Sequence, residues 1–287
     1  MARELTYYLG EVTGKRQLSP HVVRVVVGGD GIAAWTSSGV PDEAFLLVVP
    51  HPRTGELTFP DQVAGDGDPF ECSRWYTVRR YDAELHQLTV DVVVHEVGLA
   101  TRWAQLAAPG DPVGISSTRS WYELPQDATW QLLFGDIASL PAIGRIIEQA
   151  PDDVHTRVFV EIPDRDDEQV LGVDVTWEHN RDLTTRGSGL ADLVIQAELP
   201  EGPGYVYVAG EAAATRDARK NLRRERGLSK KSYGVIGYWR VDRERWMRRF
   251  EESKIDLEKI YAEGEKADLD DEQLSDEVDR RLDEAGL

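Results

Sequence analysis

An arginine, a tyrosine and a threonine follow one another closely in the stretch SRWYTVRRYD (residues 73–82). If this stretch is a strand, Arg74 and Tyr76 share one face, and Thr77 lies on the other face or at a bend. An arginine can bind a diphosphate through two parallel hydrogen bonds, and a tyrosine ring can lie flat against a flavin. A threonine hydroxyl can bind a ring nitrogen. An exposed strand with an ion-paired arginine would explain the same pattern.

The stretch VVVHEVGLATRWA, which ends at Ala104, is a second candidate binding element. It leads from a strand through Gly98 into a helix expected over residues 98–108, with Thr101 as its N-cap. A helix N-terminus approached by a glycine favours an anion, because free N–H groups and the helix dipole face it. His95 ends the strand, where it is either a ligand contact or an ordinary surface residue. The second stretch favours the binding interpretation of the first.

Short strands separated by turns account for about the first 125 residues, with few helices among them. Strands at this spacing indicate a small antiparallel β-barrel. Arg79 and Arg80 are predicted to lie at a solvated strand end. The predicted strands cover residues 21–29, 43–50, 74–81, 87–95 and 111–117.

Apolar strands alternate with helices in the next part of the chain, which predicts an α/β domain with a doubly wound, mostly parallel sheet. Such sheets bind ligands at the carboxyl ends of their strands. The strands are expected over 130–136, 155–162, 173–180, 204–210 and 232–239, and the helices over 139–150, 189–199 and 213–227. We therefore predict a barrel domain over 1–125, an α/β domain over 126–241 and a charged helical C-terminal extension over 242–287.

Charge is distributed unevenly along the chain, which has a net charge of −19. This balance argues against a nucleic-acid binder. Residues 215–250 nevertheless hold 13 Lys/Arg and 4 Asp/Glu, and the residues after them are acidic. We expect the acidic tail to fold over this basic segment. Within it, Arg216, Arg219 and Lys220 are either contacts for a cofactor phosphate or a solvated helix face.

Several classes of protein are excluded by what the sequence lacks. No apolar run is long enough to cross a membrane, and the N-terminal residues lack a secretory signal, so we expect a cytoplasmic protein without membrane insertion. Cys72 is the single cysteine, which excludes an intrachain disulfide, an iron–sulfur cluster and a cysteine-based zinc site. We predict no metal ligands and no catalytic acid or base.

Three further stretches follow in order: GDIASLPAI (135–143), AGE (209–211) and GYWR (237–240). With the Arg-x-Tyr-Thr strand and the glycine-led helix, they make the chain resemble the siderophore-interacting protein family. Members are flavoprotein ferric-siderophore reductases of the ferredoxin–NADP reductase superfamily. Leu99 stands where the family usually has a proline, and the glycine after the histidine is missing, so a shorter phosphate loop is expected. A family lysine near Leu46 or Leu47 is also absent.

The resemblance implies that FAD is bound by Arg74, Tyr76 and Thr77, with Tyr76 against the isoalloxazine ring. It implies that the substrate is met by cationic side chains, Arg119 and Arg240, with Lys231 or Lys254. The other implied cofactor contacts are Val93, His95, Gly98, Leu99, Ala100 and Thr101 near the glycine-led helix, Asp136, Ser139 and Leu140 on the nicotinamide side, and Glu211 and Trp239 at two strand ends.

The function that the resemblance implies is transfer of electrons from NADH or NADPH through FAD to a ferric siderophore, with release of Fe(II). A flavin is needed because a nicotinamide gives two electrons as hydride, whereas ferric iron takes one. The partner would be an anionic iron chelate, and ferredoxin is an alternative electron donor. Two other functions stay open: a flavin-containing protein that binds an iron chelate without turnover, and a general NAD(P)H:flavin or quinone reductase.

Overall fold

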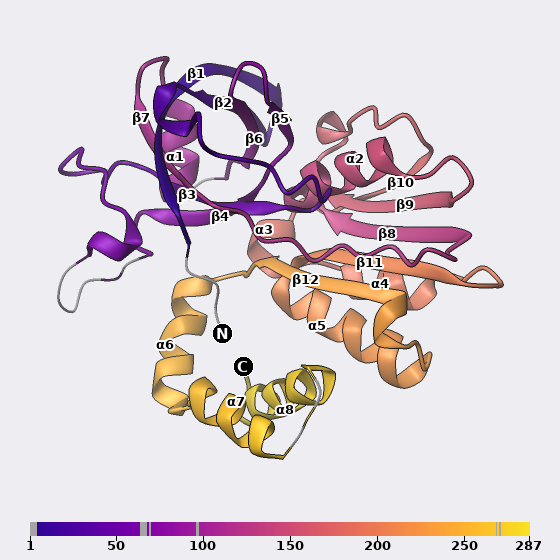
Figure 1. Cartoon of the computed structure of the whole chain (residues 1–287). Helices are drawn as coiled ribbons and strands as arrows, with labels where there is room; N and C mark the ends of the chain where they lie inside the picture. Colours follow the sequence, from indigo (N-terminus) through magenta and orange to yellow (C-terminus); the bar gives the residue numbers. More distant parts are fainter. Residues whose placement is uncertain (1–4, 64–67, 69, 96–97, 268, 270) are drawn as a thin grey trace.

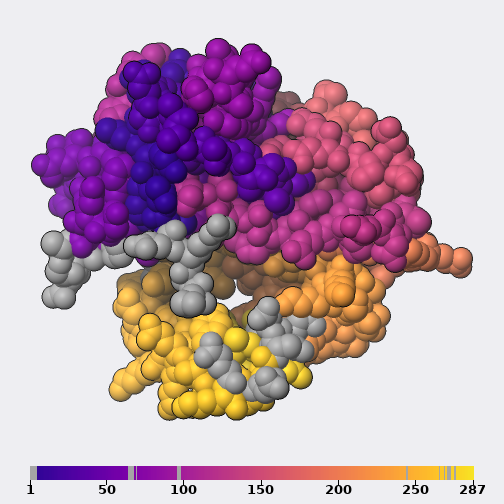
Figure 2. All heavy atoms as spheres, in the orientation of Figure 1, coloured from indigo at the N-terminus to yellow at the C-terminus, as the bar shows by residue number. Residues whose placement is uncertain are grey.

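The computed structural model describes residues 5–63, 68, 70–95, 98–267, 269 and 271–287. Figure 1 shows two domains side by side, a β-domain in indigo and purple and an α/β domain in pink and orange. The C-terminal helices lie below both domains (Figure 1). In the space-filling view these helices form a separate lobe, and a hollow lies between the lobe and the two domains (Figure 2).

The N-terminal domain is the predicted antiparallel β-barrel. Its seven strands lie in the order β4-β3-β7-β1-β2-β6-β5, and the sheet curls so that β4 contacts β6 (Figure 1). Alternate valines of β2, such as Val25 and Val27, are fully buried in the barrel core. The strands are β1 (Tyr7–Ser19), β2 (Val22–Gly28), β3 (Ala44–Val48), β4 (Ser73–Thr77), β5 (Arg80–Asp82), β6 (Gln87–Val93) and β7 (Pro112–Ser116).

Strand β1 was not among the predicted strands, although it is the longest in the chain and lies between β7 and β2. Glycines and charged residues interrupt its alternation of apolar and polar side chains. Its pairing with β2 shifts register between Val12 and Gly14, and again between Gln17 and Ser19. A Cβ atom on Gly10 would lie 3.0 Å from a carbonyl oxygen of β2, so this strand packs too closely for a larger residue there.

The second domain is the predicted α/β domain. Its five strands are all parallel and lie in the order β10-β9-β8-β11-β12. Helix α2 covers the sheet face next to the barrel, and α4 and α5 cover the opposite face. The strands are β8 (Trp130–Asp136), β9 (His155–Ile162), β10 (Val175–His179), β11 (Gly204–Glu211) and β12 (Tyr233–Trp239); the helices are α2 (Leu140–Gln149), α3 (Leu183–Arg186), α4 (Leu190–Gln196) and α5 (Ala212–Lys220).

Short helical turns connect these elements. They are 3₁₀ turns at Asp30–Ile32, Pro60–Gln62, Ile137–Ser139, Arg165–Asp167 and Lys230–Ser232, and a π-helical turn at Asn221–Glu225 that extends α5. The barrel contributes one α-helix, α1 (Leu99–Leu106).

A buried ion pair joins the two domains. Arg145 on α2 is 6% exposed, and its Nη2 lies 3.0 Å from a carboxylate oxygen of Glu43, which is fully buried before β3. Its Nη1 donates to the carbonyl oxygen of Val78 at 2.8 Å. Because Arg145 meets both a side chain and the backbone of the barrel, it fixes how α2 sits on that domain.

Arg79 belongs to the same junction, so its prediction as a solvated residue was wrong. Its guanidinium donates to both carboxylate oxygens of Glu148 on α2, at 2.5 and 3.0 Å. A strand end next to a second domain is not solvated, and the sequence pattern of the barrel alone does not show that neighbour. Arg80 is exposed, as predicted.

The C-terminal extension consists of α6 (Arg243–Ser253), α7 (Leu257–Lys266) and α8 (Asp271–Glu284). Acidic side chains of α8 pair with basic side chains of α5, which confirms that the acidic tail folds over the basic segment. Arg219 pairs with Asp279, and Lys220 Nζ lies 2.7 Å from Asp283. Among the described residues, no helix is both long and apolar enough to span a bilayer.

Candidate functional site

Three strand ends of the α/β domain meet at the carboxylate of Asp136. This side chain ends β8 and is fully buried. It accepts hydrogen bonds from the backbone N–H of Ala138 at 2.9 Å, the backbone N–H of Glu211 at 2.8 Å and the indole Nε1 of Trp239 at 2.7 Å. The structure therefore brings together three residues that were predicted separately: Asp136, Glu211 and Trp239.

The environment of Asp136 favours its protonated form. Burial raises the pKa of Asp136 to about 7, although the hydrogen bonds from Trp239 and from two backbone N–H groups lower it. The strand beside it makes room for the carboxylate, because a Cβ atom on Gly210 would lie 2.5 Å from its Oδ2. Asp136 is therefore a buried carboxyl group, with a pKa of about 7, at the carboxyl edge of the sheet.

Glu211 caps the helix that follows its own strand. Its Oε2 accepts from the N–H groups of Ala213 at 2.7 Å and Ala214 at 2.9 Å, so it is the N-cap of α5. The Glu211 side chain, which the resemblance implies as a cofactor contact, therefore binds the backbone of its own helix. The N–H groups of Ala213 and Ala214 are therefore not available to an anionic ligand.

The turn after β8 is packed inward. Ser139 is fully buried and its hydroxyl donates to the carbonyl oxygen of Asp136 at 2.7 Å, and Leu140 is 3% exposed. Both residues lie at the predicted nicotinamide side. A cofactor at this edge would meet the backbone of the turn rather than these two side chains.

Strand β4 carries the predicted flavin contacts on its two faces. Arg74 and Tyr76 are half-buried on one face, whereas Thr77 is buried on the other. Arg74 Nη1 donates to the carbonyl oxygens of Phe70 at 2.8 Å and Ser73 at 2.6 Å, which holds the guanidinium in place. Burial raises the pKa of Tyr76 well above its ordinary value, so its phenol is neutral.

Arg74 has a second arginine among its neighbours. Desolvation lowers its pKa most, the nearby guanidinium of Arg243, at the start of α6, lowers it further, and the Asp68 carboxylate raises it. Among the described residues no carboxylate lies within 4.0 Å of Arg74. An arginine that is half-buried, held by carbonyls and beside a second arginine is prepared to receive an anion.

The end of β4 meets β12 at the junction of the two domains. Tyr238 lies against Thr77, and its hydroxyl is 3.1 Å from the hydroxyl of Tyr207. Tyr207 in turn donates to Asp42 of the barrel at 3.4 Å. The Arg-x-Tyr-Thr strand and the Gly-Tyr-Trp-Arg strand, which are far apart in sequence, therefore meet through Thr77 and Tyr238.

Helix α1 begins one residue after Gly98, so the prediction of Thr101 as N-cap was wrong. Gly98 is the N-cap, with a φ of 150°, and no side chain of the described residues caps the helix. Thr101 is the third helical residue and is buried; its hydroxyl accepts from the N–H of His95 at 3.3 Å. Glycine begins the helix because its backbone adopts the positive φ that this entry requires.

The N-terminus of α1, without a side-chain cap among the described residues, could offer backbone N–H groups to an anion, so the phosphate loop stays a prediction. Ala100 is buried and Leu99 packs on the barrel core, so a ligand would meet their N–H groups rather than their side chains. His95 is exposed, and partial burial lowers its pKa. Val93 packs against the core of the α/β domain, at the junction rather than in the loop.

The predicted substrate cations do not form one cluster. Arg119 lies over the ring of Trp75 at 5.1 Å, and Arg240 lies over the ring of Trp246 at 4.3 Å. Lys231 precedes β12 whereas Arg240 follows it, so a strand about 23 Å long separates them. Lys254 follows the far end of α6. The structure does not bring the two lysines to the sheet edge.

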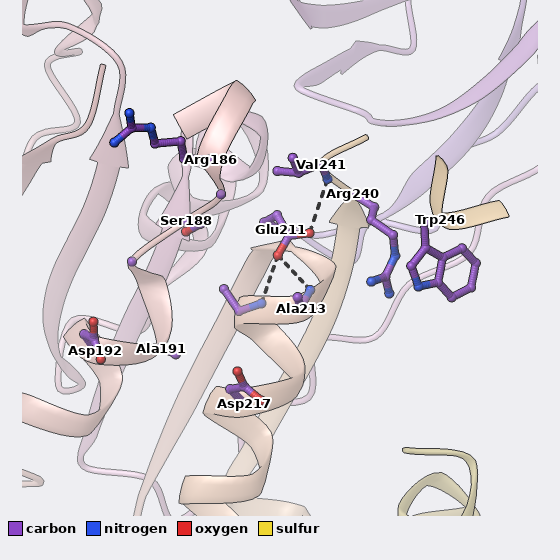
Figure 3. A pocket seen from close by; sticks show the side chains of 13 residues that line it. Arg186, Ser188, Ala191, Asp192, Glu211, Ala213, Asp217, Arg240, Val241 and Trp246 are labelled. Atoms are coloured by element: carbon purple, nitrogen blue, oxygen red, sulfur yellow. Dashed lines mark hydrogen bonds between the residues drawn. The ribbon is translucent and has the colours of Figure 1, made fainter. Parts of the chain in front are cut away.

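A pocket of about 400 Å³ opens beside Glu211, on the sheet face covered by α4 and α5. Figure 3 shows Ser188, Ala191 and Asp192 on one side, Ala213 and Asp217 on α5 on the other, and Arg240 with Trp246 beyond Glu211. Sequence reasoning did not identify this pocket. The glycines on either side of Ser188 were the available signal, since they precede a helix at a strand-end loop.

Comparison with known proteins agrees with this geometry. Residues 11–120 match the siderophore-interacting FAD-binding domain, and residues 128–242 match the siderophore-interacting protein family. The chain is 33% identical over 258 residues to an uncharacterised protein of Mycobacterium tuberculosis, with 81% of this chain and 90% of that protein covered. It is 28% identical over 243 residues to the ferric vibriobactin reductase ViuB of Vibrio cholerae, with 79% and 86% covered.

A solved structure gives the same result. The siderophore utilization protein from T. fusca superposes with a TM-score of 0.71 at 36% identity, over 82% of this chain and 93% of that one. The similarity extends across both domains, the order of the two family regions follows the chain, and the barrel carries the FAD-binding region. The chain belongs to the siderophore-interacting protein family.

Proposed function

We propose that this protein is an FAD-dependent oxidoreductase that takes electrons from NADH or NADPH and reduces a ferric siderophore, releasing Fe(II). One observation carries the proposal: Thr77, at the end of β4, contacts Tyr238 of β12, and the next residue of β12, Trp239, donates to the Asp136 carboxylate. The predicted flavin surface and the ligand-binding edge of the α/β domain are therefore neighbours. Similarity to a ferric vibriobactin reductase supports the same reaction.

The residues present fit FAD. Arg74 has an immobilised guanidinium without an ion pair among the described residues, which suits a diphosphate. Tyr76 offers a half-buried ring on the same face of β4. Gly98 leads into a helix start with no side-chain cap, where phosphate oxygens find N–H groups. Bound FAD would supply the conversion of a two-electron hydride donor into one-electron steps for iron.

The chain's own residues orient the ligands and set the charge around them. Asp136 fixes the indole of Trp239 at the edge where the nicotinamide is expected. Arg119 and Arg240 are cations on a protein with a net charge of −19, so they favour approach of an anionic chelate. Oxygen-donor chelates hold Fe(III) far more tightly than Fe(II), so reduction loosens the iron.

The test begins with the visible spectrum of the purified protein, where flavin absorbance is expected. The FAD-loaded protein is then mixed anaerobically with NADH or NADPH, and with a ferric catecholate chelate in a second step. Bleaching by a nicotinamide and reoxidation by the chelate support the proposal. A colourless protein that takes up no FAD contradicts it.

The second step also separates the other functions. Flavin that stays oxidised with both nicotinamides but is bleached by reduced ferredoxin identifies ferredoxin as the donor. Flavin that no donor reduces, in a protein that still binds the ferric chelate, indicates binding without turnover. Faster reoxidation by a quinone than by any ferric chelate indicates a quinone reductase.

A further inference from the structure

The pocket between α4 and α5 carries an unusual balance of charge for a nucleotide site. Its wall on the two helices holds the carboxylates of Asp192 and Asp217, which are exposed at the pocket (Figure 3). Arg186 extends away from both of them in Figure 3 and pairs with Asp182 at 3.5 Å. The helical end of the pocket is therefore negatively charged.

The opposite end of the pocket is different. Arg240 lines it, stacked on Trp246, and desolvation lowers the pKa of Arg240 while Glu211 raises it. Arg240 directly follows Trp239, whose indole bonds to Asp136. The pocket therefore extends to the sheet edge where the nicotinamide is expected. Arg240 lies at that end of the pocket, and the two carboxylates lie at the helical end.

The cations of α5 that would suit an extra phosphate already have partners. Arg216 Nη2 donates to the carbonyl oxygen of Leu287 at 2.9 Å, while its Nε and Nη1 are buried without a hydrogen-bond partner among the described residues. Arg219 pairs with Asp279. Lys220 Nζ lies 2.7 Å from Asp283 and only 3.9 Å from Asp217. Each of these three side chains, considered from sequence as a phosphate contact, is held by α8 or by the end of the chain.

A ribose 2′-hydroxyl and a 2′-phosphate are bound by different kinds of side chain. In dinucleotide-binding folds a carboxylate accepts a hydrogen bond from the 2′-hydroxyl of an NADH ribose, whereas a nearby arginine accommodates a 2′-phosphate. Two carboxylates repel a phosphate dianion, although solvent screens groups as exposed as these.

We propose that this pocket binds the adenosine ribose of the donor and selects NADH over NADPH. Asp192 and Asp217 disfavour a 2′-phosphate in the pocket. The α8 carboxylates hold Arg216, Arg219 and Lys220 away from such a phosphate. Arg240 then binds the diphosphate of the same nucleotide. This inference rests on the proposed function, because it concerns the electron donor of the same reaction.

The first test measures anaerobic flavin reduction in the FAD-loaded full chain at increasing NADH and NADPH. We expect kcat/KM to be at least about tenfold higher for NADH, a modest ratio because the carboxylates are exposed. Equal values, or a preference for NADPH, overturn the inference.

The second test does not depend on activity. Calorimetric titration is expected to show 5′-ADP binding at least about tenfold more tightly than 2′,5′-ADP. The double variant Asp192→Asn/Asp217→Asn should bring the two dissociation constants together, mainly by improving that of 2′,5′-ADP. Asp153→Asn is the matched control, because this exposed carboxylate lies before β9, at the opposite edge of the sheet.

The third test concerns α8. Asp276→Asn/Asp279→Asn removes both α8 carboxylates that pair with Arg219, and Asp283→Asn removes the α8 partner of Lys220. Binding of 2′,5′-ADP should then strengthen several-fold and become more sensitive to salt. A 2′,5′-ADP affinity that is unchanged in both sets of variants overturns the selection mechanism.

These readouts separate failure of the inference from failure of the proposed function. If a nicotinamide reduces the flavin but 5′-ADP does not bind, the pocket assignment is wrong and the proposed reaction stands. If neither nicotinamide reduces the flavin, the proposed reaction is wrong, and the ratio of 5′-ADP to 2′,5′-ADP binding still decides the selectivity of the pocket.

Discussion

The indole Nε1 of Trp239 donates a 2.7 Å hydrogen bond to the Asp136 carboxylate, which ties the end of β12 to the end of β8 across the intervening strand β11. Strand β11 joins the same carboxylate through the N–H of Glu211. One buried group therefore sets the relative positions of three strand ends, and with them the shape of the edge where nucleotide and flavin are expected to meet.

Asp136 should make stability depend on pH in the direction opposite to that of an ordinary aspartate. Burial raises its pKa to about 7 in the folded protein, whereas an unfolded aspartate has a pKa of about 3.9. Between these values the folded protein binds more protons than the unfolded chain, so the stability contributed by this group falls as pH rises. Below about pH 4 its contribution is fully present.

Asp136→Asn removes this titration. The free energy of unfolding of the wild type, minus that of the variant, should fall by up to about 4 kcal/mol between about pH 4 and about pH 7. Urea titrations followed by tryptophan fluorescence measure both values on flavin-free protein. A difference that stays constant with pH would show that Asp136 does not titrate in this window.

Arg145 should be the most costly single side chain to remove at the junction of the domains. Arg145→Ala leaves the Glu43 carboxylate buried without its cation, which typically costs about 3–5 kcal/mol. Arg79→Ala is the matched control, because its partner Glu148 is 55% exposed and such a pair contributes at most about 1 kcal/mol. Chemical denaturation checks both, and similar losses would contradict the difference in burial.

Arg74 should control retention of the flavin. Arg74→Ala removes a charge-assisted contact to a diphosphate, so the dissociation constant for FAD should rise about tenfold or more. Quenching of FAD fluorescence on binding measures the constant. Arg80→Ala changes an exposed arginine six positions away and should leave it unchanged; equal effects of the two substitutions would remove Arg74 from the flavin site.

Arg240 has two proposed roles that one substitution distinguishes. As a contact for the chelate, Arg240→Ala should raise KM for a ferric catecholate and leave KM for NADH unchanged. As the diphosphate contact of the pocket beside Glu211, it should raise KM for NADH about tenfold and leave chelate reduction by pre-reduced enzyme unchanged. Steady-state and single-turnover rates on the same preparation give both constants.

Much of the fold was predictable because its strands and helices follow simple periodicities. Buried and less buried residues alternate along β2 from Val23 to Val27, and β8 is mostly apolar and buried along its whole length, as is typical of a central parallel strand. β1 was not predictable in this way, since Gly10 and Gly14 serve close packing and changes of register rather than a regular pattern.

Site residues that belong to sequence motifs could be predicted, whereas residues that become neighbours only through the tertiary fold could not. The residues around Asp136 were identified from a sequence resemblance, and the structure joins them. The approach of Arg243 to Arg74 could not be inferred, because it depends on a left-handed residue, Asp242, that turns the chain into α6. Glu148, the partner of Arg79, is likewise a neighbour only after the domains pack.

The ion pair between Arg145 and Glu43 also bears on how the protein would work over a cycle. Separating the domains would strip a buried carboxylate of its cation, so a hinge at this boundary is energetically blocked. The β-barrel and the carboxyl edge of the α/β sheet are therefore held in one relative geometry. Under the proposed function, donor and acceptor would replace one another at a rigid frame rather than through opening of the two domains.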